Sequence, residues 1–267
     1  MTDQTDQPVL YDVADAVATI TLNRSKAMNS LDVPTKVALR EAVTEAAEDP
    51  GVRCVVLTGN GRAFCVGQDL REHVEILHSE SSQALFRTVP EHYNPIVTAL
   101  ATMPKPVVAA VNGVAAGAGA SLAFACDLRV LGHGAGFNLA FSGIALSCDT
   151  GSSWTLPRLV GQAKALELMY FPRTVGSEEA LELGLATRVV PADALAEEVR
   201  LLARQMAAGP TVAFGAIRRS VGYSAGHDLV SSLGVEAEMM AMTGATEDHR
   251  NAVDAFIAKE KPLFEGR

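Results

Sequence analysis

Three short apolar runs constrain the fold more than any other feature of this chain. They cover residues 54–58, 106–111 and 128–131. Runs of this length, with few polar residues inside them, are typical of strands that are buried on both faces, as in a parallel sheet. The stretches between them predict helices at 70–79, 84–101 and 117–125. Strands that alternate with helices in this way predict an α/β fold with crossover connections.

The two ends of the chain have a different pattern from its middle. Residues 9–13 and 17–22 predict two short strands, and a helix with Asp32 as its N-cap follows and ends near Glu48. After about residue 160 the strand pattern almost disappears, except near 187–190. The helices expected there cover 161–170, 177–183, 192–208, 211–223, 226–243 and 246–259. The sequence therefore predicts a helical C-terminal part.

The composition narrows the function classes. Hydrophobic residues make up 48% of the 267 residues and charged residues 20%, so the chain can bury a sizeable core. No apolar run reaches the roughly 18 residues of a membrane span, and the polar, acidic start lacks a signal-peptide pattern, which favours a cytoplasmic protein. The net charge of −9 disfavours nucleic acid as a partner, because such binding depends on dense Lys and Arg. A small anionic ligand remains compatible with this charge.

The cysteines give no sign of a metal centre. Cys54, Cys65, Cys126 and Cys148 form neither a CxxC pair nor a cluster with histidines. We expect reduced, mostly buried thiols and no metal site.

Two glycine-rich stretches, 61–70 and 112–121, each follow a predicted strand and precede a predicted helix. Free backbone N–H groups point outward at such a place, and small residues let a ligand approach the backbone. Two N–H groups aimed at one point would form an oxyanion hole. For either stretch alone, glycine and alanine after a strand more often reflect tight packing of helix on sheet. A dinucleotide site is not favoured, because no ribose-binding acid follows the second stretch.

Several motifs occur in a fixed order along the chain. They are residues 23–31, 62–70, 105–113, 125–127, 151–154, 156–161 and 255–259. In this order and spacing they resemble the enoyl-CoA hydratase/isomerase (crotonase) family from end to end. Within the family the chain is most similar to ring-1,2-epoxyphenylacetyl-CoA isomerases, through residues 137–141, Trp154 and Pro157. The resemblance implies a spiral core of repeated ββα units at 1–200, with CoA and acyl sites, and a helical oligomerisation region at 201–267.

The resemblance also implies roles for individual residues. The backbone N–H groups of Gln68 and Ala118 match the oxyanion hole for the thioester oxygen, with Ala118 in place of the usual glycine. The loop that holds the CoA adenine and phosphates is matched by Lys26, Ala27 and Met28.

Near the C-terminus, Phe256 and Lys259 match residues that touch CoA, often from a neighbouring subunit. A core aromatic residue and a solvated lysine are equally compatible interpretations of these two positions. The family commonly forms a homotrimer or a dimer of trimers, so we expect one of these assemblies.

The departures from the family pattern favour isomerisation over hydration. Hydratases of the family use two glutamates to activate one water, and these positions hold Ser121 and Phe141 here. Asp149 matches the single catalytic carboxylate of several isomerases, although on its own it predicts a turn residue or a helix N-cap. We expect Ser121, Phe141 and Cys148 to line the acyl pocket.

The predicted function is the movement of a double bond in an enoyl-CoA thioester. Asp149 would act as general base, and Gln68 and Ala118 would stabilise the dienolate. Apolar neighbours at 141, 144 and 146 would raise the pKa of Asp149 by desolvation. No cofactor is needed beyond the coenzyme A of the substrate. Three alternatives remain: a hydratase or ring-opening isomerase with Ser121 or Cys148 holding the water, a dehalogenase-like hydrolase with Asp149 as nucleophile, and an acyl-CoA binder without turnover.

Overall fold

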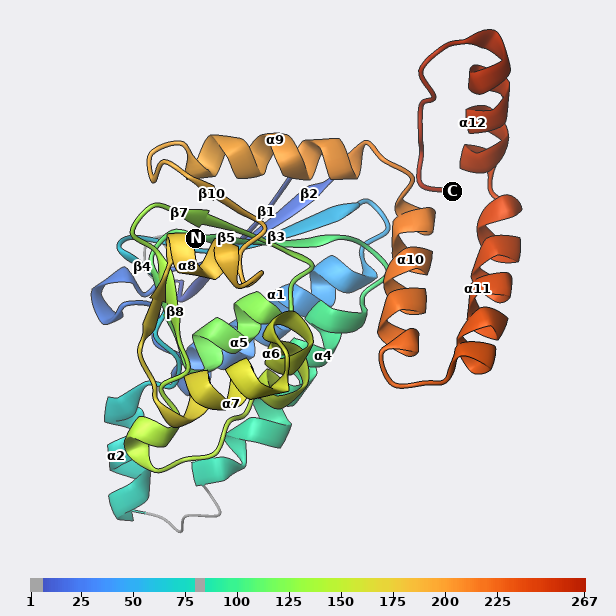
Figure 1. Ribbon diagram of the computed structural model, residues 1–267. Helices are drawn as coiled ribbons and strands as arrows, with labels where there is room; N and C mark the ends of the chain where they lie inside the picture. Colours follow the sequence, from blue (N-terminus) through green and yellow to red (C-terminus); the bar gives the residue numbers. More distant parts are fainter. Residues whose placement is uncertain (1–6, 80–84) are drawn as a thin grey trace.

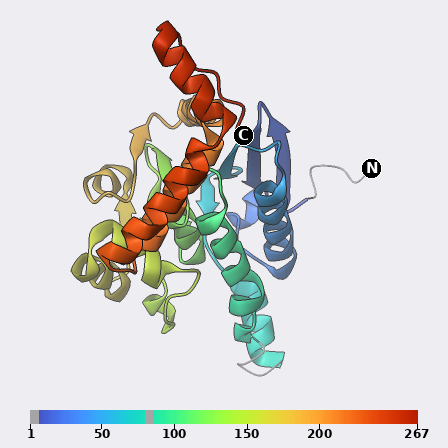
Figure 2. The same ribbon diagram turned by 90° about the vertical axis from the view of Figure 1, so that its right-hand side faces the viewer.

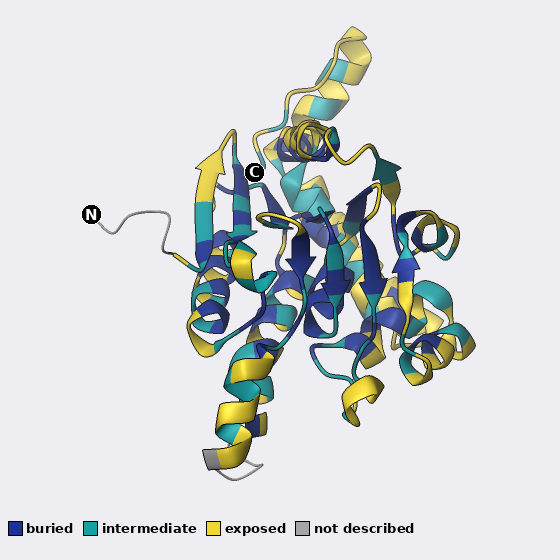
Figure 3. Cartoon of the chain, turned by 90° about the vertical axis from the view of Figure 1, so that its left-hand side faces the viewer, coloured by how far each residue is buried: buried dark blue, intermediate teal, exposed yellow. Residues whose placement is uncertain are grey.

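The main sheet confirms the three buried strands that the sequence predicts. The structure, a computed structural model, describes residues 7–79 and 85–267. Six strands follow the order β1-β2-β3-β5-β7-β10, with bounds Val9–Ala14, Val17–Leu22, Cys54–Gly59, Val107–Val111, Leu128–Gly132 and Arg188–Val190. Strands β1 and β2 form an antiparallel hairpin, and the other neighbours pair in parallel. Figure 3 shows how completely the central strands are buried.

A second sheet lies where the residue pattern predicts no strand, and two of its four strands fall in the glycine-rich stretches. It contains β4 (Ala63–Cys65), β6 (Val114–Ala116), β8 (Gly136–Asn138) and β9 (Thr174–Gly176) in this order. The first three pair in parallel, and β9 runs antiparallel to β8. Each strand has three residues, which is too short for an alternating pattern to appear in the sequence.

The two sheets arise from a repeated unit. A strand of the main sheet, a short strand of the second sheet and a helix follow one another as β3-β4-α2, β5-β6-α5 and β7-β8-α6. The helices are α2 (Leu70–Ser79), α5 (Ala118–Phe124) and α6 (Ser152–Val160). The predicted spiral of ββα units is therefore confirmed, and each turn brings the end of its short strand to the same side of the molecule.

Helices cover both faces of the main sheet (Figure 1). On one face α9 (Leu195–Ala207) packs its buried residues against β3, β5 and β7. On the other face the larger core cluster joins the sheet to the remaining helices. These helices are α1 (Val33–Glu48), α4 (Asn94–Thr102), α5, α6 and α7 (Gln162–Tyr170), and α8 (Ser177–Glu182) lies beside them. A five-residue π-helix, η3 (Val89–Tyr93), precedes α4 directly.

The last three helices extend from one side of the core. They are α10 (Thr211–Ser224), α11 (Leu229–Gly244) and α12 (Glu247–Ala258), and Figures 1 and 2 show them as an arm beside the sheets. The predicted division of the chain at residue 200 falls inside α9, which belongs to the core. The division into two parts stays a prediction. None of the helices in the described residues is long and apolar enough to cross a membrane.

Candidate active site

The loops after β4 and β6 lie against each other because these two strands are parallel neighbours. Glycines allow the close approach. A Cβ atom added to Gly119 would overlap the carbonyl oxygen of Cys65, and one added to Gly113 would overlap that of Arg62. A Cβ on Gly67 would lie 3.3 Å from the backbone nitrogen of Ala118. The loop before α2 and the first turn of α5 are therefore in backbone contact.

Gln68 presents a backbone N–H that the fold leaves unused. Its neighbours on both sides bond to Leu31: the Leu31 N–H donates to the Gly67 carbonyl at 2.8 Å, and the Asp69 N–H donates to the Leu31 carbonyl at 3.1 Å. In such a parallel bridge the N–H of the middle residue points to the opposite side. Within the described residues it has no acceptor.

Ala118 supplies a second unused donor. It is the first residue of α5, and an N–H at this position has no partner inside the helix. Gly117 turns the chain into the helix with φ 51° and ψ −123°, a backbone conformation that favours glycine. No acceptor for the Ala118 N–H occurs among residues 7–79 and 85–267. The two free donors therefore lie on adjoining loops that are in backbone contact.

Asp149 is a half-buried acid whose carboxylate is almost uncommitted. Its Oδ1 accepts a hydrogen bond of 2.8 Å from the Thr150 hydroxyl. Helix α6 begins after Gly151 without a side-chain cap, so the alternative that Asp149 is an N-cap is wrong. Burial raises the pKa of the Asp149 carboxyl, and the Thr150 hydrogen bond opposes this shift. Ile144, one of its predicted apolar neighbours, is 52% exposed.

Asp149 is linked to the two donor loops by hydrogen bonds of neighbouring residues and by one charge interaction. Ser152, three residues further on, shares a short hydrogen bond with Ser121 of α5. The negative charge of Asp149 also contributes to the raised pKa of Tyr93. The Tyr93 hydroxyl in turn donates to the Gln68 side chain at 2.6 Å. The structure thus gathers Gln68, Ala118 and Asp149 in one region.

Neither of the positions that the resemblance matches to hydratase glutamates holds a carboxylate. Ser121 is fully buried, and its hydroxyl donates to the Gly117 carbonyl at 3.0 Å besides its bond to Ser152. Phe141 lies near the turn into α5, since a Cβ on Gly117 would be 3.9 Å from its ring. Cys148, beside Asp149, is a half-buried free thiol.

Comparisons with known proteins agree over almost the whole chain. Residues 12–267 match the family model described as enoyl-CoA hydratase/isomerase. The chain belongs to the enoyl-CoA hydratase/isomerase family. It is 38% identical to a 1,2-epoxyphenylacetyl-CoA isomerase of Escherichia coli over 97% of this chain and 98% of the relative. It is 32% identical to a 2,3-dehydroadipyl-CoA hydratase of the same organism over 94% and 96%.

Solved structures of the family give the same result. The crystal structure of an enoyl-CoA hydratase from Bacillus anthracis superimposes with a TM-score of 0.92 at 31% identity, covering 98% of this chain and all of that one. The protein is therefore an acyl-CoA enzyme of the enoyl-CoA hydratase/isomerase family. Some relatives are named as isomerases and others as hydratases, so their names do not distinguish the two reactions.

The predicted CoA contacts of this family enzyme fall in two separate places. Met28 lies next to the donor loop, because the Val66 N–H donates to its carbonyl at 3.3 Å. Lys26 is exposed on the same turn, η2 (Ser25–Ala27). Phe256 and Lys259 are on the arm, and Phe256 is 83% exposed, so the interpretation as a core aromatic is wrong for the single chain. The CoA roles themselves stay predictions.

Sequence analysis missed three side chains that surround Gln68: Lys36, Glu72 and Tyr93. Lys36 lies on the buried face of α1 with Leu39 and Val43, at helical spacing. A lysine in an apolar stripe was the signal that could have revealed it. Tyr93 follows Pro90 and ends the π-helix, and such irregular turns occur frequently at functional sites.

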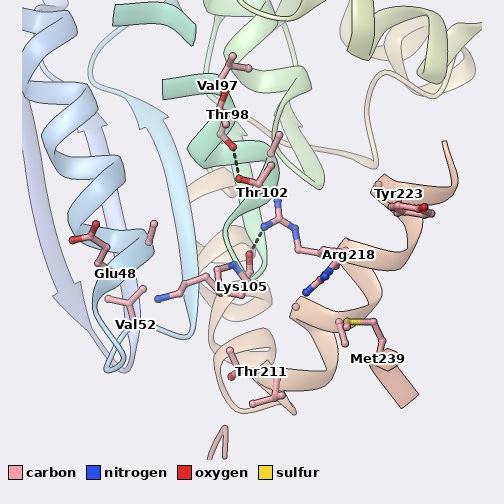
Figure 4. Close-up of a pocket in the computed structure, with 18 of the residues that line it drawn as sticks. Glu48, Val52, Val97, Thr98, Thr102, Lys105, Thr211, Arg218, Tyr223 and Met239 are labelled. Atoms are coloured by element: carbon pink, nitrogen blue, oxygen red, sulfur yellow. Dashed lines mark hydrogen bonds between the residues drawn. The ribbon is translucent and has the colours of Figure 1, made fainter. Parts of the chain in front are cut away.

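A cavity of about 1000 Å³ lies between α4 and the α10–α11 pair. Figure 4 shows Val97 and Thr98 of α4 on one side, with Tyr223 and Met239 of the arm on the other. The Arg218 guanidinium donates to the Lys105 carbonyl in its wall at 2.8 Å. Gln68, Ala118 and Asp149 do not line it, so the cavity is separate from the candidate active site.

Proposed function

We propose that this family member is an enoyl-CoA isomerase that converts a 3-enoyl-CoA into a 2-enoyl-CoA. The observation that carries the proposal is the Asp149 carboxylate, which is half-buried, has a raised pKa and accepts a hydrogen bond from Thr150. A base with these properties suits the removal of a weakly acidic C–H proton, because its pKa is nearer to neutral.

The proposed reaction is a proton shuttle. Asp149 takes a proton from C2 of the substrate, and the electrons of that C–H bond spread over the carbonyl and the neighbouring double bond. The resulting dienolate places negative charge on the thioester oxygen, between the N–H groups of Gln68 and Ala118. Each N–H donor stabilises the transition state by on the order of 3 kcal/mol. Protonated Asp149 then returns the proton at C4, and the double bond now lies between C2 and C3.

Two further observations support isomerisation rather than hydration. The Ser121 hydroxyl is fully buried and already bonded to Gly117 and Ser152, so it is poorly placed to hold a catalytic water. The nearby Glu72 carboxylate accepts from Lys36 and Gln68 on one oxygen and from the Val33 N–H on the other. These donors occupy Glu72, which leaves Asp149 as the better base.

The exposed apolar face of the arm supports an oligomer. Val230, Met240 and Ile257 are each more than 70% exposed, and apolar surface of this kind is typical of protein–protein interfaces. We propose a homotrimer or a dimer of trimers in which the arm covers a neighbouring subunit. Phe256 and Lys259 would then contact CoA bound by that neighbour.

The decisive experiment is incubation of the protein with 3-enoyl-CoA and 2-enoyl-CoA of several chain lengths. Conjugation of the double bond with the thioester is followed by absorbance, and the gain of water by mass. An isomerase raises the absorbance with 3-enoyl-CoA without adding 18 mass units, the mass of one water. Loss of conjugation with water gained from 2-enoyl-CoA would show a hydratase instead. Halide release from a halogenated aryl-CoA would show the hydrolase, and binding without turnover would show an acyl-CoA binder.

The matching variant is Asp149→Asn. It should lower kcat by a factor of about 10² to 10⁴, the usual contribution of a general base, and should leave the Kd for a saturated CoA thioester nearly unchanged. Equal loss of binding and of turnover would show that Asp149 is a structural turn residue.

A further inference from the structure

A polar cluster surrounds the Gln68 side chain, and it is buried at Lys36 and Tyr93 and half-buried at Gln68 and Glu72. Its members are Lys36 of α1, Gln68, Glu72 of α2 and Tyr93 of η3. Lys36 is 1% exposed, and its ammonium donates to Gln68 Oε1 at 3.2 Å and to Glu72 Oε1 at 3.1 Å. Gln68 Nε2 donates to Glu72 Oε1 at 3.1 Å. Every polar end of the Gln68 side chain is therefore held by a partner from another element or the next helical turn.

Tyr93 of η3 completes the cluster. Its ring is 1% exposed, and its hydroxyl donates to Gln68 Oε1 at 2.6 Å. The Lys36 ammonium also lies 5.7 Å from the centre of the Tyr93 ring, within range of a cation–π contact. Burial, with the charge of Asp149, holds the Tyr93 pKa well above its ordinary value, so the hydroxyl keeps its proton and remains a donor.

Stability alone explains such a cluster poorly. A buried ion pair loses its hydration, and apolar residues of similar volume usually serve the fold as well or better. The cluster instead has a geometric effect, because Gln68 carries the oxyanion donor on its backbone. A side chain bonded at both polar ends restricts the rotation of its own backbone, and so restricts the direction of the N–H group.

We infer that Lys36 is a positioning residue that, with Glu72 and Tyr93, aims the Gln68 N–H at the thioester oxygen. This inference rests on the proposed oxyanion site but not on which reaction follows. A change of about 1 Å in a donor position is enough to cost about 100-fold in rate. Lys36→Met, which keeps the length of the side chain and removes its charge and donors, should therefore lower kcat tenfold to hundredfold, with little change in KM.

The test uses infrared spectroscopy on butyryl-CoA labelled with ¹³C at the thioester carbonyl, a saturated ester that the proposed reaction leaves unchanged. Bound to the wild-type protein, the carbonyl band should shift to lower frequency than in water. Lys36→Met should lose at least half of this shift while its Kd changes less than threefold. Gln68→Leu keeps the N–H but removes the clamped side chain, so it should lose as much. The double variant should lose no more than either single one.

Lys105→Met is the matched control. Lys105 is also buried, at 5% exposed, but it donates to the carbonyls of Ala46 and Asp49, away from Gln68. It should lower the melting temperature while the carbonyl band keeps the wild-type shift. If Lys36→Met does not fold, Glu72→Gln tests the same clamp with a smaller change. A full shift in the folded Lys36 or Glu72 variant would overturn the inference. A wild-type protein without any shift would overturn the oxyanion site and this inference together, whereas a shift without isomerisation would refute only the proposed reaction.

Discussion

A backbone N–H can rarely be removed by mutation without the loss of a hydrogen bond of the fold, but the Ala118 N–H can. Ala118 is the first residue of α5, where proline is well tolerated because the missing N–H has no helical partner. Ala118→Pro therefore removes one of the two proposed oxyanion donors and costs the helix no hydrogen bond. The transition state should lose about 2.7–4 kcal/mol, which is a 10²- to 10³-fold fall in kcat for the 3-enoyl-CoA reaction.

The assay follows the rise of conjugated thioester absorbance at saturating substrate, with melting temperatures measured in parallel. Ala118→Gly is the control, because it keeps the N–H while changing the same position. Its rate should stay within a few-fold of the wild type. A proline variant that folds normally and retains more than a tenth of the wild-type kcat would refute the assignment of Ala118 as a donor.

Three further predictions concern protonation and assembly. Because burial raises the Asp149 pKa, kcat/KM should fall as the pH drops through that raised value, and Thr150→Ala should move this limb to higher pH whereas Thr150→Ser should not. Burial disfavours the ionised carboxylate in the folded state, so Asp149→Asn should raise the melting temperature at neutral pH. It should have little effect below about pH 3, where the acid is protonated in both folded and unfolded states; an equal rise at both pH values would contradict this. Val230→Asp on the exposed face of α11 should shift the protein to monomers in light scattering, and an unchanged mass would exclude that face from the interface.

The sequence predicts the main sheet well because full burial leaves a direct trace in it. Residues 54–58 and 106–111 are almost uniformly apolar, and both form central parallel strands. The second sheet leaves no such trace, since its three-residue strands are held by backbone pairing and by glycine contacts. Backbone pairing between distant segments does not depend on a residue pattern that can be recognised locally.

The residues of the site also divide into those that the sequence predicts and those that it does not. Positions such as Asp149 and Ser121 can be located from motifs, because the chemistry of a carboxylate or its absence is visible in the residue type. The partners of Gln68 could not be located in this way. Lys36 and Tyr93 are 32 and 25 residues away in the sequence, and only the stacking of α1 and η3 on the donor loop brings them together.

The glycine contacts between the β4 and β6 loops have an evolutionary consequence. The loops that carry the two amides follow adjacent strands, which lie about 4.8 Å apart in any sheet, and Gly67 and Gly119 allow these loops their close contact. The approximate spacing of the two proposed donors is thus inherited with the architecture, whereas the side chains around Gln68 set the direction of its N–H group. Replacing a few side chains beside that framework, such as Phe141, would then change the chemistry offered to the substrate while leaving the two amides in place.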